Sequence, residues 1–384
     1  MIMYACKVGD KIIMPRNVHK SVINALVICG AEPVYVNPGM NKDIGIALGM
    51  TVEDIREAIK RSPDAKAVFV NNPTYYGICA DLRAIVKLAH EHDMLVLVDE
   101  AWGTHFYFGD NQPVSAMQAE ADVSCVSMHK TGGALTQSSF LVCGKKINQG
   151  YMRQIINLMQ TTSASYLLLT SLDLARKNMF MNGRELVSKT IEFSEYARGE
   201  INKIGGYYAY AKELINGGNI YDFDLARLSV YTREIGLAGK EVYDILRDEY
   251  DIQIELGDIG NIIAIISAGD RMTEIERLIA ALTDIKRLYA KDKAGMLEHE
   301  YINPIVKIAP QKAFYSDKTS VLIAGSTGRI SGEFVMCYPP GIPILAPGEL
   351  ITGDIVDYIK YAKEKGCFLM GTEDMDVSYI NVLE

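Results

Sequence analysis

The first half of the chain contains the segment Ser127-Met-His-Lys-Thr-Gly-Gly-Ala-Leu-Thr-Gln-Ser-Ser139. Its lysine follows the apolar run Val123-Ser-Cys-Val126 and precedes a second strand-like run, Ser139-Phe-Leu-Val-Cys143. A lysine that is partly desolvated at a strand end can exist as the neutral amine, which attacks aldehydes. The neighbouring glycines and hydroxyl groups would let a phosphate approach closely. We therefore interpret Lys130 as a reactive amine; the alternative is a surface lysine after a strand.

Short apolar runs alternate with helical patterns in the first 100 residues of the chain. The expected strands are Lys11–Met14, Glu32–Val36, Ala67–Val70 and Met94–Val98, and the expected helices are His19–Ala31, Val52–Arg61 and Leu82–Glu91. Fully apolar strands between amphipathic helices are typical of a parallel sheet covered on both faces. The sequence therefore predicts an α/β fold with a mainly parallel sheet.

Polar clusters follow four of the apolar runs. They are Pro15–His19, Asn71–Tyr75, Asp99–Trp102 and Ser127–Lys130. In open α/β sheets, ligands bind beyond the carboxyl ends of the strands. The four clusters therefore predict a single shared active site.

Composition excludes several classes of protein. The chain has 384 residues, of which 49% are hydrophobic and 23% charged, and this indicates a large globular domain with a smaller one. A net charge of −9 without a basic stripe argues against nucleic-acid binding. No signal peptide and no apolar stretch of membrane-spanning length are found. Seven scattered cysteines indicate reduced thiols, a cytoplasmic location and no metal site.

The second half predicts two smaller units. The expected elements are a long helix from Ser165 to about Ile204, strands at Leu225–Tyr231 and Ile262–Ile266, and helices at Gly239–Glu249 and Thr273–Lys291. We expect a major domain at residues 1–293, within which 205–293 form a small α/β subdomain. Residues 294–384 are expected to form a C-terminal domain.

Four segments occur in the order found in one protein family. Ser-Met-His-Lys at 127–130 resembles the pyridoxal-phosphate attachment site of the bacterial ornithine/lysine/arginine decarboxylases. The segments at 15–21, 99–103 and 328–349 resemble other parts of the same family, and the resemblance runs from about Lys7 to Glu349. It implies an aminotransferase-like fold (fold type I) with a small C-terminal α/β domain, and pyridoxal 5'-phosphate as the cofactor.

The resemblance implies a role for each strand-end residue. Lys130 would form the imine with the cofactor, and Asp99 would keep the pyridine nitrogen protonated so that the ring can withdraw electrons. Ala101 would pack against the ring, and His19 would stack on it and exchange protons. The alternatives are that Asp99 caps a helix or forms an ion pair, and that His19 is only a helix cap.

Four further residues would contact the cofactor by resemblance. Ser127 and His129 would bind its phosphate, and Thr74 would approach from another strand end, unless it only forms a turn. Thr161, or its neighbour Thr162, lies in a segment that resembles one reaching across a dimer interface to a neighbour's phosphate. The resemblance thus implies a homodimer or a larger homo-oligomer.

The implied reaction is decarboxylation of a basic amino acid at its α-carbon. Conversion of arginine to agmatine is the first expectation, with lysine and ornithine as alternatives. Lys130 or His19 would return the proton to the α-carbon. An acid should meet the substrate's cationic side chain, and the unranked candidates are Glu255, Asp258, Glu333 and Glu349.

The beginning of the chain departs from the family. Met1–Cys6 reads as the end of a helix that turns at Gly9, and the preceding block, whose helix N-terminus binds the phosphate in relatives, is not in the sequence. We expect a weakened cofactor site unless a separate chain supplies that segment. One alternative is a truncated, catalytically silent homologue that acts as a dimerisation or regulatory partner. Another is an aminotransferase or amino-acid lyase using Arg329 for the substrate carboxylate, although the setting of Arg329 matches the decarboxylases.

Overall fold

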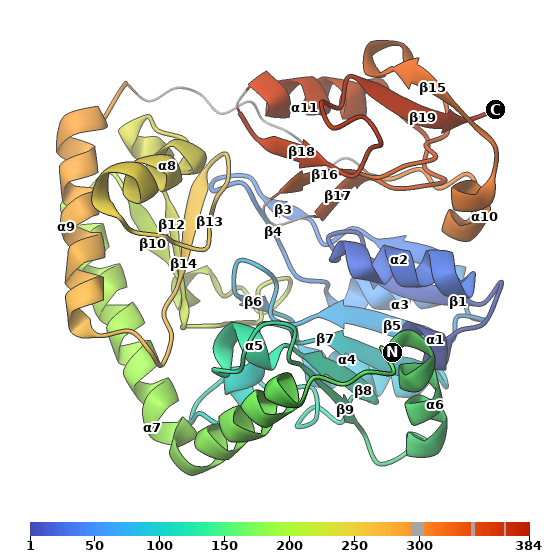
Figure 1. The fold of residues 1–384 in the computed structure, drawn as a ribbon, viewed down its shortest axis with the longest axis horizontal. Helices are drawn as coiled ribbons and strands as arrows, with labels where there is room; N and C mark the ends of the chain where they lie inside the picture. Colours follow the sequence, from blue (N-terminus) through green and yellow to red (C-terminus); the bar gives the residue numbers. More distant parts are fainter. Residues whose placement is uncertain (293–302, 339–341, 365) are drawn as a thin grey trace.

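The computed structural model describes residues 1–292, 303–338, 342–364 and 366–384, arranged around a six-stranded sheet (Figure 1). Its order is β2 (Glu32–Val36), β1 (Lys11–Pro15), β5 (Ala67–Asn71), β7 (Leu95–Asp99), β8 (Val123–Val126) and β9 (Phe140–Cys143). All neighbours pair in parallel except β8 and β9, which are antiparallel. The predicted α/β class with a mainly parallel sheet is confirmed.

Helices cover both faces of this sheet. They are α1 (Ile2–Ala5), α2 (Lys20–Cys29), α3 (Val52–Arg61), α4 (Leu82–His90) and α6 (Gln149–Met159). Ile13, Val68 and Val96 pack into a core with α3 and α4. Their strand neighbours Ile12 and Leu97 face the opposite core, with α1, α2 and α6. Because successive strand residues point to opposite faces, burial of both faces requires apolar residues throughout each strand.

Local capping fixes the helix ends close to their expected positions. The Thr51 hydroxyl accepts from the Asp54 N–H, and the Asp54 carboxylate accepts from the Thr51 N–H, which is a capping box at α3. His19 caps α2, and Gly30 ends it with a φ of 74°. His19 is therefore fixed just beyond the carboxyl end of β1.

A 39-residue helix, α7 (Tyr166–Ile204), leads to a second sheet (Figure 1). This sheet is antiparallel, with the order β10 (Tyr208–Tyr210), β12 (Arg227–Tyr231), β14 (Asn261–Ile265) and β13 (Leu256–Gly257). Its helices are α8 (Gly239–Tyr250) and α9 (Met272–Tyr289). The short pair β6 (Ile78–Cys79) and β11 (Asp222–Phe223) ties this unit to the turn after β5. A small hairpin, β3 (Met40–Asn41) and β4 (Ile46–Ala47), lies after β2.

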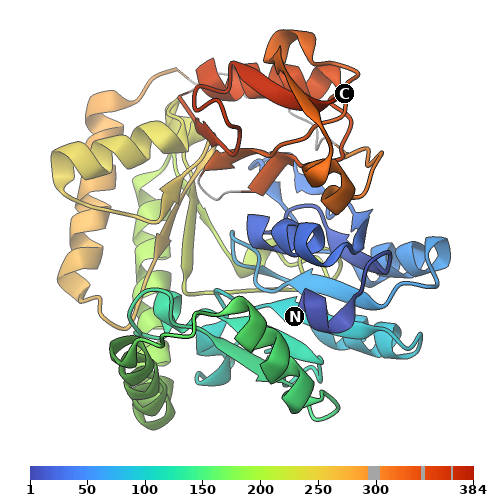
Figure 2. The ribbon, with the colours of Figure 1, turned by 45° about the vertical axis from the view of Figure 1, so that its right-hand side comes forward.

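The remaining elements form a C-terminal unit next to α2 (Figure 2). They are α10 (Pro310–Tyr315), β15 (Lys318–Leu322), β16 (Val335–Tyr338), β17 (Ile342–Leu345), α11 (Gly353–Glu364), β18 (Phe368–Met370) and β19 (Tyr379–Leu383). Two hydrogen bonds join Arg16 after β1 to Glu349, Nε to Oε1 at 3.0 Å and Nη2 to Oε2 at 2.9 Å. Arg16 is 4% exposed and Glu349 2%, so this bidentate ion pair is buried where the two units meet.

The expected domain boundary at residue 293 lies outside the described residues. The division into 1–293, with 205–293 as a subdomain, and 294–384 therefore stays a prediction. Across the part of the chain that the structure describes, no helix combines the length and apolar character needed to cross a bilayer.

Candidate functional site

The carboxyl ends of the parallel strands bring the predicted residues to one edge of the sheet. Pairing of β5 with β7 sets Asn71 beside Asp99, and pairing of β7 with β8 sets Asp99 beside Cys125. Lys130 follows β8 on the single-turn helix α5 (Met128–Thr131). The edge therefore carries the Asp99 carboxylate at the end of β7 and the Lys130 amine just beyond the adjacent strand β8.

Lys130 is half-buried against an aromatic ring. Its Nζ lies 4.4 Å from the centroid of the Trp102 indole, within the range of a cation–π contact. Burial lowers the pKa of Lys130, and the positive charge of Arg227 lowers it further, while Asp99 opposes both. A lowered pKa increases the fraction of neutral amine, which is the nucleophilic form.

The Asp99 carboxylate is oriented by one backbone group. Its Oδ1 accepts from the Ala101 N–H at 2.9 Å, and among the described residues no other hydrogen bond to this carboxylate is found. Its charge raises the pKa values of both His19 and Lys130 against the effect of burial. The three predicted groups therefore interact electrostatically, and one Asp99 oxygen is left for a further donor.

His19 both caps α2 and faces the site. Its Nδ1 accepts from the Ser21 N–H at 3.3 Å and lies 2.8 Å from the Ser21 Oγ. The residue is exposed as a whole, yet the protein atoms around the ring lower its pKa, and Lys130 and Lys20 add to this effect. The cap uses only Nδ1, so capping does not exclude the predicted role over the cofactor ring.

The loop around Lys130 carries hydroxyl groups without partners. The Ser127 side chain makes no capping hydrogen bond, although its carbonyl accepts from the Thr104 Oγ1 at 3.3 Å. Thr131 Oγ1 and Ser138 Oγ are buried and have no hydrogen-bond partner among the described residues. The His129 N–H donates to the Ser138 carbonyl, and burial lowers the pKa of the His129 ring, as does nearby Lys130.

These observations fit pyridoxal phosphate. The amine has a lowered pKa, the neighbouring carboxylate has a free oxygen, and Ala101 adds little bulk beside it. Buried hydroxyls without partners can donate to phosphate oxygens, which are strong acceptors. The arrangement of this loop therefore suits an aldehyde that carries an anionic group.

A buried acid holds the loop that contains Asp99 and Trp102. Glu100 is 0% exposed and accepts from the Tyr107 hydroxyl at 2.5 Å, the Ser124 hydroxyl at 2.5 Å and the Ala116 N–H at 2.7 Å. Burial raises the pKa of Glu100 to about 7, against the effect of these donors. Glu100 therefore fixes the position of the loop that contains Asp99 and Trp102, a role that the sequence did not reveal.

Two predicted residues have local partners instead. The Thr74 hydroxyl accepts from the Ile78 N–H at 3.1 Å, which closes the turn after the cis Asn72–Pro73 bond. This is the alternative role considered for Thr74. Thr161 lies in the exposed segment between α6 and α7, where its hydroxyl accepts from the Ser163 N–H at 3.2 Å. Cofactor contacts by Thr74 and Thr161 stay predictions.

The structure separates the candidate acids for the substrate side chain. Glu255 is exposed, accepts from the Tyr75 hydroxyl at 2.5 Å, and its charge raises the pKa of Lys130. Asp258 accepts from the Tyr76 hydroxyl at 2.6 Å and from the Gly260 N–H at 2.7 Å. Glu349 is occupied by its ion pair with Arg16. Of these three, only Glu255 is both exposed and electrostatically coupled to the amine.

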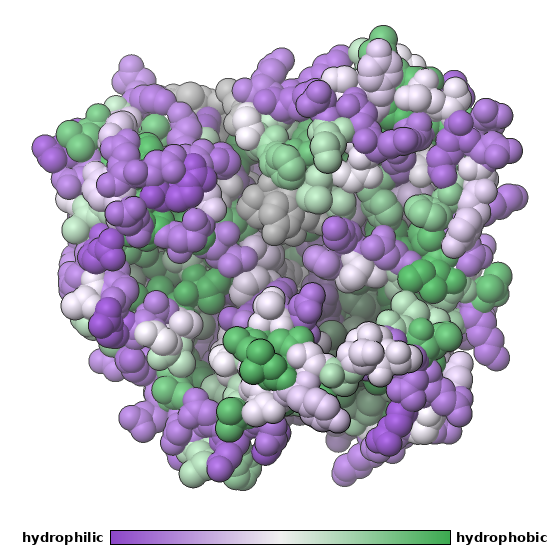
Figure 3. Space-filling model, viewed as in Figure 1, coloured by the Kyte–Doolittle hydropathy of each residue, from purple (hydrophilic) through white to green (hydrophobic). Residues whose placement is uncertain are grey.

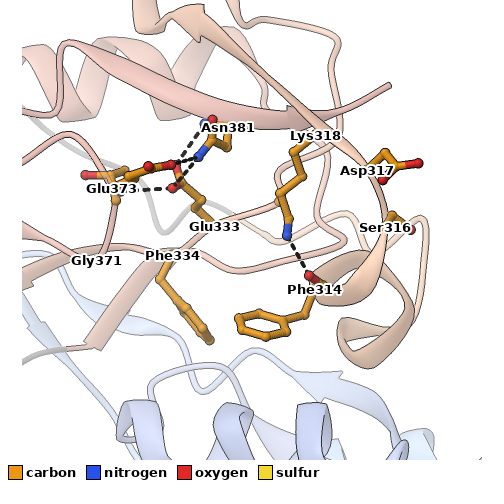
Figure 4. Close-up of a pocket in the computed structure, with 11 residues that line it drawn as sticks. Phe314, Ser316, Asp317, Lys318, Glu333, Phe334, Gly371, Glu373 and Asn381 are labelled. Carbon is orange, nitrogen blue, oxygen red and sulfur yellow. Dashed lines mark hydrogen bonds between the residues drawn. The ribbon is translucent and has the colours of Figure 1, made fainter.

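Glu333 belongs to a different hollow. A pocket of about 640 Å³ lies in the C-terminal unit and is lined by Phe314, Lys318, Glu333, Glu373 and Asn381 among others (Figure 4). Glu333 Oε1 accepts from the Asn381 Nδ2 and the Glu373 N–H, and Oε2 accepts from the Asn381 N–H, each at 2.8 or 2.9 Å. Glu333 therefore fastens β19 and is not part of the Lys130 site.

Two site residues were missed by the sequence analysis. Trp102 ends the polar cluster Asp99–Trp102, for which no role of the indole was predicted, yet its ring contacts Lys130 and stands edge-on to Tyr75, with centroids 5.7 Å apart. The Arg227 Cζ lies 4.1 Å from the same Trp102 centroid. The one available signal was a charged residue inside the apolar run Leu225–Tyr231.

A mainly parallel sheet with a lysine beyond β8 and an acid at the end of β7 is the arrangement of the fold type I class of pyridoxal-phosphate enzymes. A lysine decarboxylase from Francisella novicida superposes with a TM-score of 0.85 at 21% identity, over 100% of this chain and 67% of that one. A ureidoglycine–glyoxylate aminotransferase from Bacillus subtilis has a TM-score of 0.58 at 16% identity, over 76% of this chain and 78% of that one. At these identities the likeness shows the fold alone.

The family follows from the sequence comparisons. The model of the Orn/Lys/Arg decarboxylase major domain matches residues 1–228, and that of the C-terminal domain matches residues 296–373. Arginine decarboxylases of Bacillus anthracis and Bacillus subtilis are 41% and 40% identical, each over 100% of this chain and 79% of the relative. The chain belongs to the ornithine/lysine/arginine decarboxylase family and is a carboxy-lyase, as the resemblance implied. No comparison supports the alternative of a silent partner.

The lowered pKa of Lys130 predicts how imine formation depends on pH. Because the neutral amine attacks, the rate with pyridoxal phosphate should rise with pH and reach half its maximum below the ordinary lysine value of about 10.4. Asp99→Asn removes a charge that raises this pKa, so the midpoint should fall further. Imine absorbance in rapid mixing, with borohydride fixation at Lys130, measures the rate. Exposed Asp64→Asn is the control, and a wild-type midpoint at or above about 10.4 would contradict the prediction.

Proposed function

We propose that the protein decarboxylates arginine to agmatine with pyridoxal 5'-phosphate as its cofactor. The observation that carries the proposal is the half-buried Lys130 amine, with its lowered pKa, coupled to Asp99 on the adjacent strand. The choice of arginine rests on the Bacillus relatives named arginine decarboxylase at about 40% identity. The inducible lysine decarboxylase of Escherichia coli K12 is only 22% identical.

Each residue of the site has a defined task in this reaction. When bound, the cofactor would delocalise the electron pair that is left on the α-carbon as carbon dioxide departs. The Lys130 Nζ would hold the cofactor through its aldehyde carbon, and the same amine would deliver the proton that the α-carbon takes up. The free carboxylate oxygen of Asp99 would keep the pyridine nitrogen of the cofactor protonated, because a negative charge favours the protonated form of a neighbouring base. Ala101 would leave room for the cofactor ring, and the His19 ring would stack on it or exchange the proton through Nε2.

Release of carbon dioxide from arginine, lysine and ornithine tests the function. We expect arginine to react fastest, and Lys130→Ala to lower the rate by on the order of 10³-fold or more. Exposed Lys145→Ala is the matched control and should leave the rate unchanged. No release from any of the three amino acids would refute the proposal, whereas faster release from lysine would correct only the substrate.

We further propose that Glu255 receives the guanidinium of arginine. Its carboxylate is exposed at the site and already accepts from the Tyr75 hydroxyl, so a second cationic donor can join it. Glu255→Gln keeps an acceptor for Tyr75 but removes the charge. We expect KM for arginine to rise about 10- to 100-fold with a smaller change in kcat, the effect of losing one charge-assisted hydrogen bond.

Glu276→Gln provides the control for Glu255. Glu276 also accepts from an exposed tyrosine, Tyr196, at 2.5 Å, on the outer helices α9 and α7. An unchanged KM in Glu255→Gln, or an equal rise in Glu276→Gln, would contradict the assignment of Glu255.

We also propose a homodimer formed through α6 and the start of α7. Leu158, Met159, Tyr166 and Leu167 are between 52% and 83% exposed there. Figure 3 shows hydrophobic side chains gathered over α5 and the first turns of α7. Exposed apolar patches of this kind typically mark protein interfaces. Thr161 lies within this surface, where a partner's cofactor site could meet it.

The molar mass in solution tests the dimer. Light scattering should give twice the 42.5 kDa of one chain, and Leu167→Glu should shift the mass toward one chain. Val8→Glu changes another exposed apolar residue away from this surface and serves as the control. A wild-type mass of one chain at micromolar concentration would contradict the dimer.

A further inference from the structure

Arg227 is a buried cation whose hydrogen-bonding capacity is largely unused. It begins β12 and is 1% exposed. Its Nη1 and Nη2 have no hydrogen-bond partner among the described residues. Its Nε lies 3.4 Å from the Asp224 Oδ2, which is a long contact. Buried guanidinium donors without acceptors are costly, so their presence indicates that something else binds them.

The acid beside Arg227 is shared with other donors. Asp224 is 0% exposed, and its Oδ1 lies 2.7 Å from the His105 Nε2 and accepts from the Ala226 N–H at 3.1 Å. This arrangement holds Asp224 in place and points its negative charge partly toward His105. Among the described residues, Asp224 therefore provides no acceptor for the Arg227 Nη1 and Nη2.

The Arg227 guanidinium and the Lys130 amine lie over the same Trp102 ring. The Arg227 Cζ lies 4.1 Å from the Trp102 centroid and 5.8 Å from the Tyr75 centroid, and the Lys130 Nζ lies 4.4 Å from the same Trp102 ring. A Cβ at Gly77 would come within 3.0 Å of the Arg227 Cγ, and Gly77 has a φ of 92°. Glycine at this turn therefore makes space for the arginine stem on its way to the site.

We propose that Arg227 binds the α-carboxylate of the amino-acid substrate through Nη1 and Nη2. The substrate amine must reach the carbon that Lys130 holds, and the α-carboxylate is the anionic group attached one carbon away. A planar guanidinium with two free donors on one edge matches a carboxylate in bidentate geometry. The identity of the substrate rests on the proposed function, but every amino acid carries this group.

Binding through Arg227 distinguishes substrate from product. Decarboxylation removes the group that Arg227 holds and leaves an amine with no anion. Arg227 therefore strengthens binding of the amino acid and adds nothing to binding of the amine, so the product leaves a site in which the guanidinium is again without an acceptor.

The test compares an amino acid with its own amine in the cofactor-loaded protein. Dissociation constants for arginine and agmatine are read from the change in cofactor absorbance on rapid mixing, before turnover. Arg227→Lys keeps the positive charge but loses the planar pair of Nη donors, and Arg227→Gln loses both the charge and that pair. We expect each variant to weaken arginine binding by about 10- to 100-fold and agmatine binding by less than about 3-fold.

A matched arginine variant serves as the control. Arg233→Lys, a change in another buried arginine of the same unit, should alter neither constant. Equal weakening of arginine and agmatine in the Arg227 variants would overturn the proposal. So would a loss of pyridoxal-phosphate affinity with an unchanged ratio of the two constants, which would assign the guanidinium to the cofactor phosphate. Failure of both variants to fold would show a structural role and would also overturn it.

The same measurement with lysine and cadaverine, or ornithine and putrescine, keeps this proposal apart from the proposed function. If arginine proves to be the wrong substrate, the ratio of the dissociation constants of the correct amino acid and its amine still shows whether Arg227 binds the α-carboxylate. An unchanged ratio for all three pairs would refute the role of Arg227 and leave the decarboxylase activity intact.

Discussion

Parallel pairing of β1, β5, β7 and β8 is the constraint on which the rest of the structure depends. Because these strands run in one direction and both faces of the sheet are buried, their polar residues can only gather where the strands end. Asp99 ends β7, and His19 and Lys130 lie a few residues beyond β1 and β8. Three segments that are distant in sequence thus become one site without any dedicated domain for it.

The charges at this edge are arranged around one indole ring. Lys130 and Arg227 both lie over Trp102, and their mutual repulsion helps to lower the lysine pKa. The negative charges of Asp99 and Glu255 raise the pKa of Lys130 and so partly offset the lowering by burial and by Arg227. A balance of this kind suits the proposed roles of the Lys130 amine as nucleophile and proton carrier.

The sequence was informative wherever the signal was local. Apolar runs and caps gave β1, β5, β7 and α3 within about a residue, and strand ends pointed to Lys130 and Asp99. Long-range partners could not be read in this way. Glu349 was a candidate for the substrate, yet it pairs with Arg16 across 333 positions. Arg227 lies over Trp102 although β12 belongs to a separate antiparallel sheet, which the pairing of β11 with β6 joins to the turn after β5, and no periodicity encodes that packing.

The Arg16–Glu349 pair links two parts of the chain that separate family models describe. Arg16 lies three residues before His19, and its guanidinium also donates to the Pro343 carbonyl at 2.8 Å. Leaving a charge of this kind alone in the interior costs about 3–5 kcal/mol, a large share of the net stability of a typical domain. The amino-terminal and carboxy-terminal segments are consequently interdependent: a fragment that ended before residue 296 would bury the Arg16 cation without its counter-ion, three residues before His19.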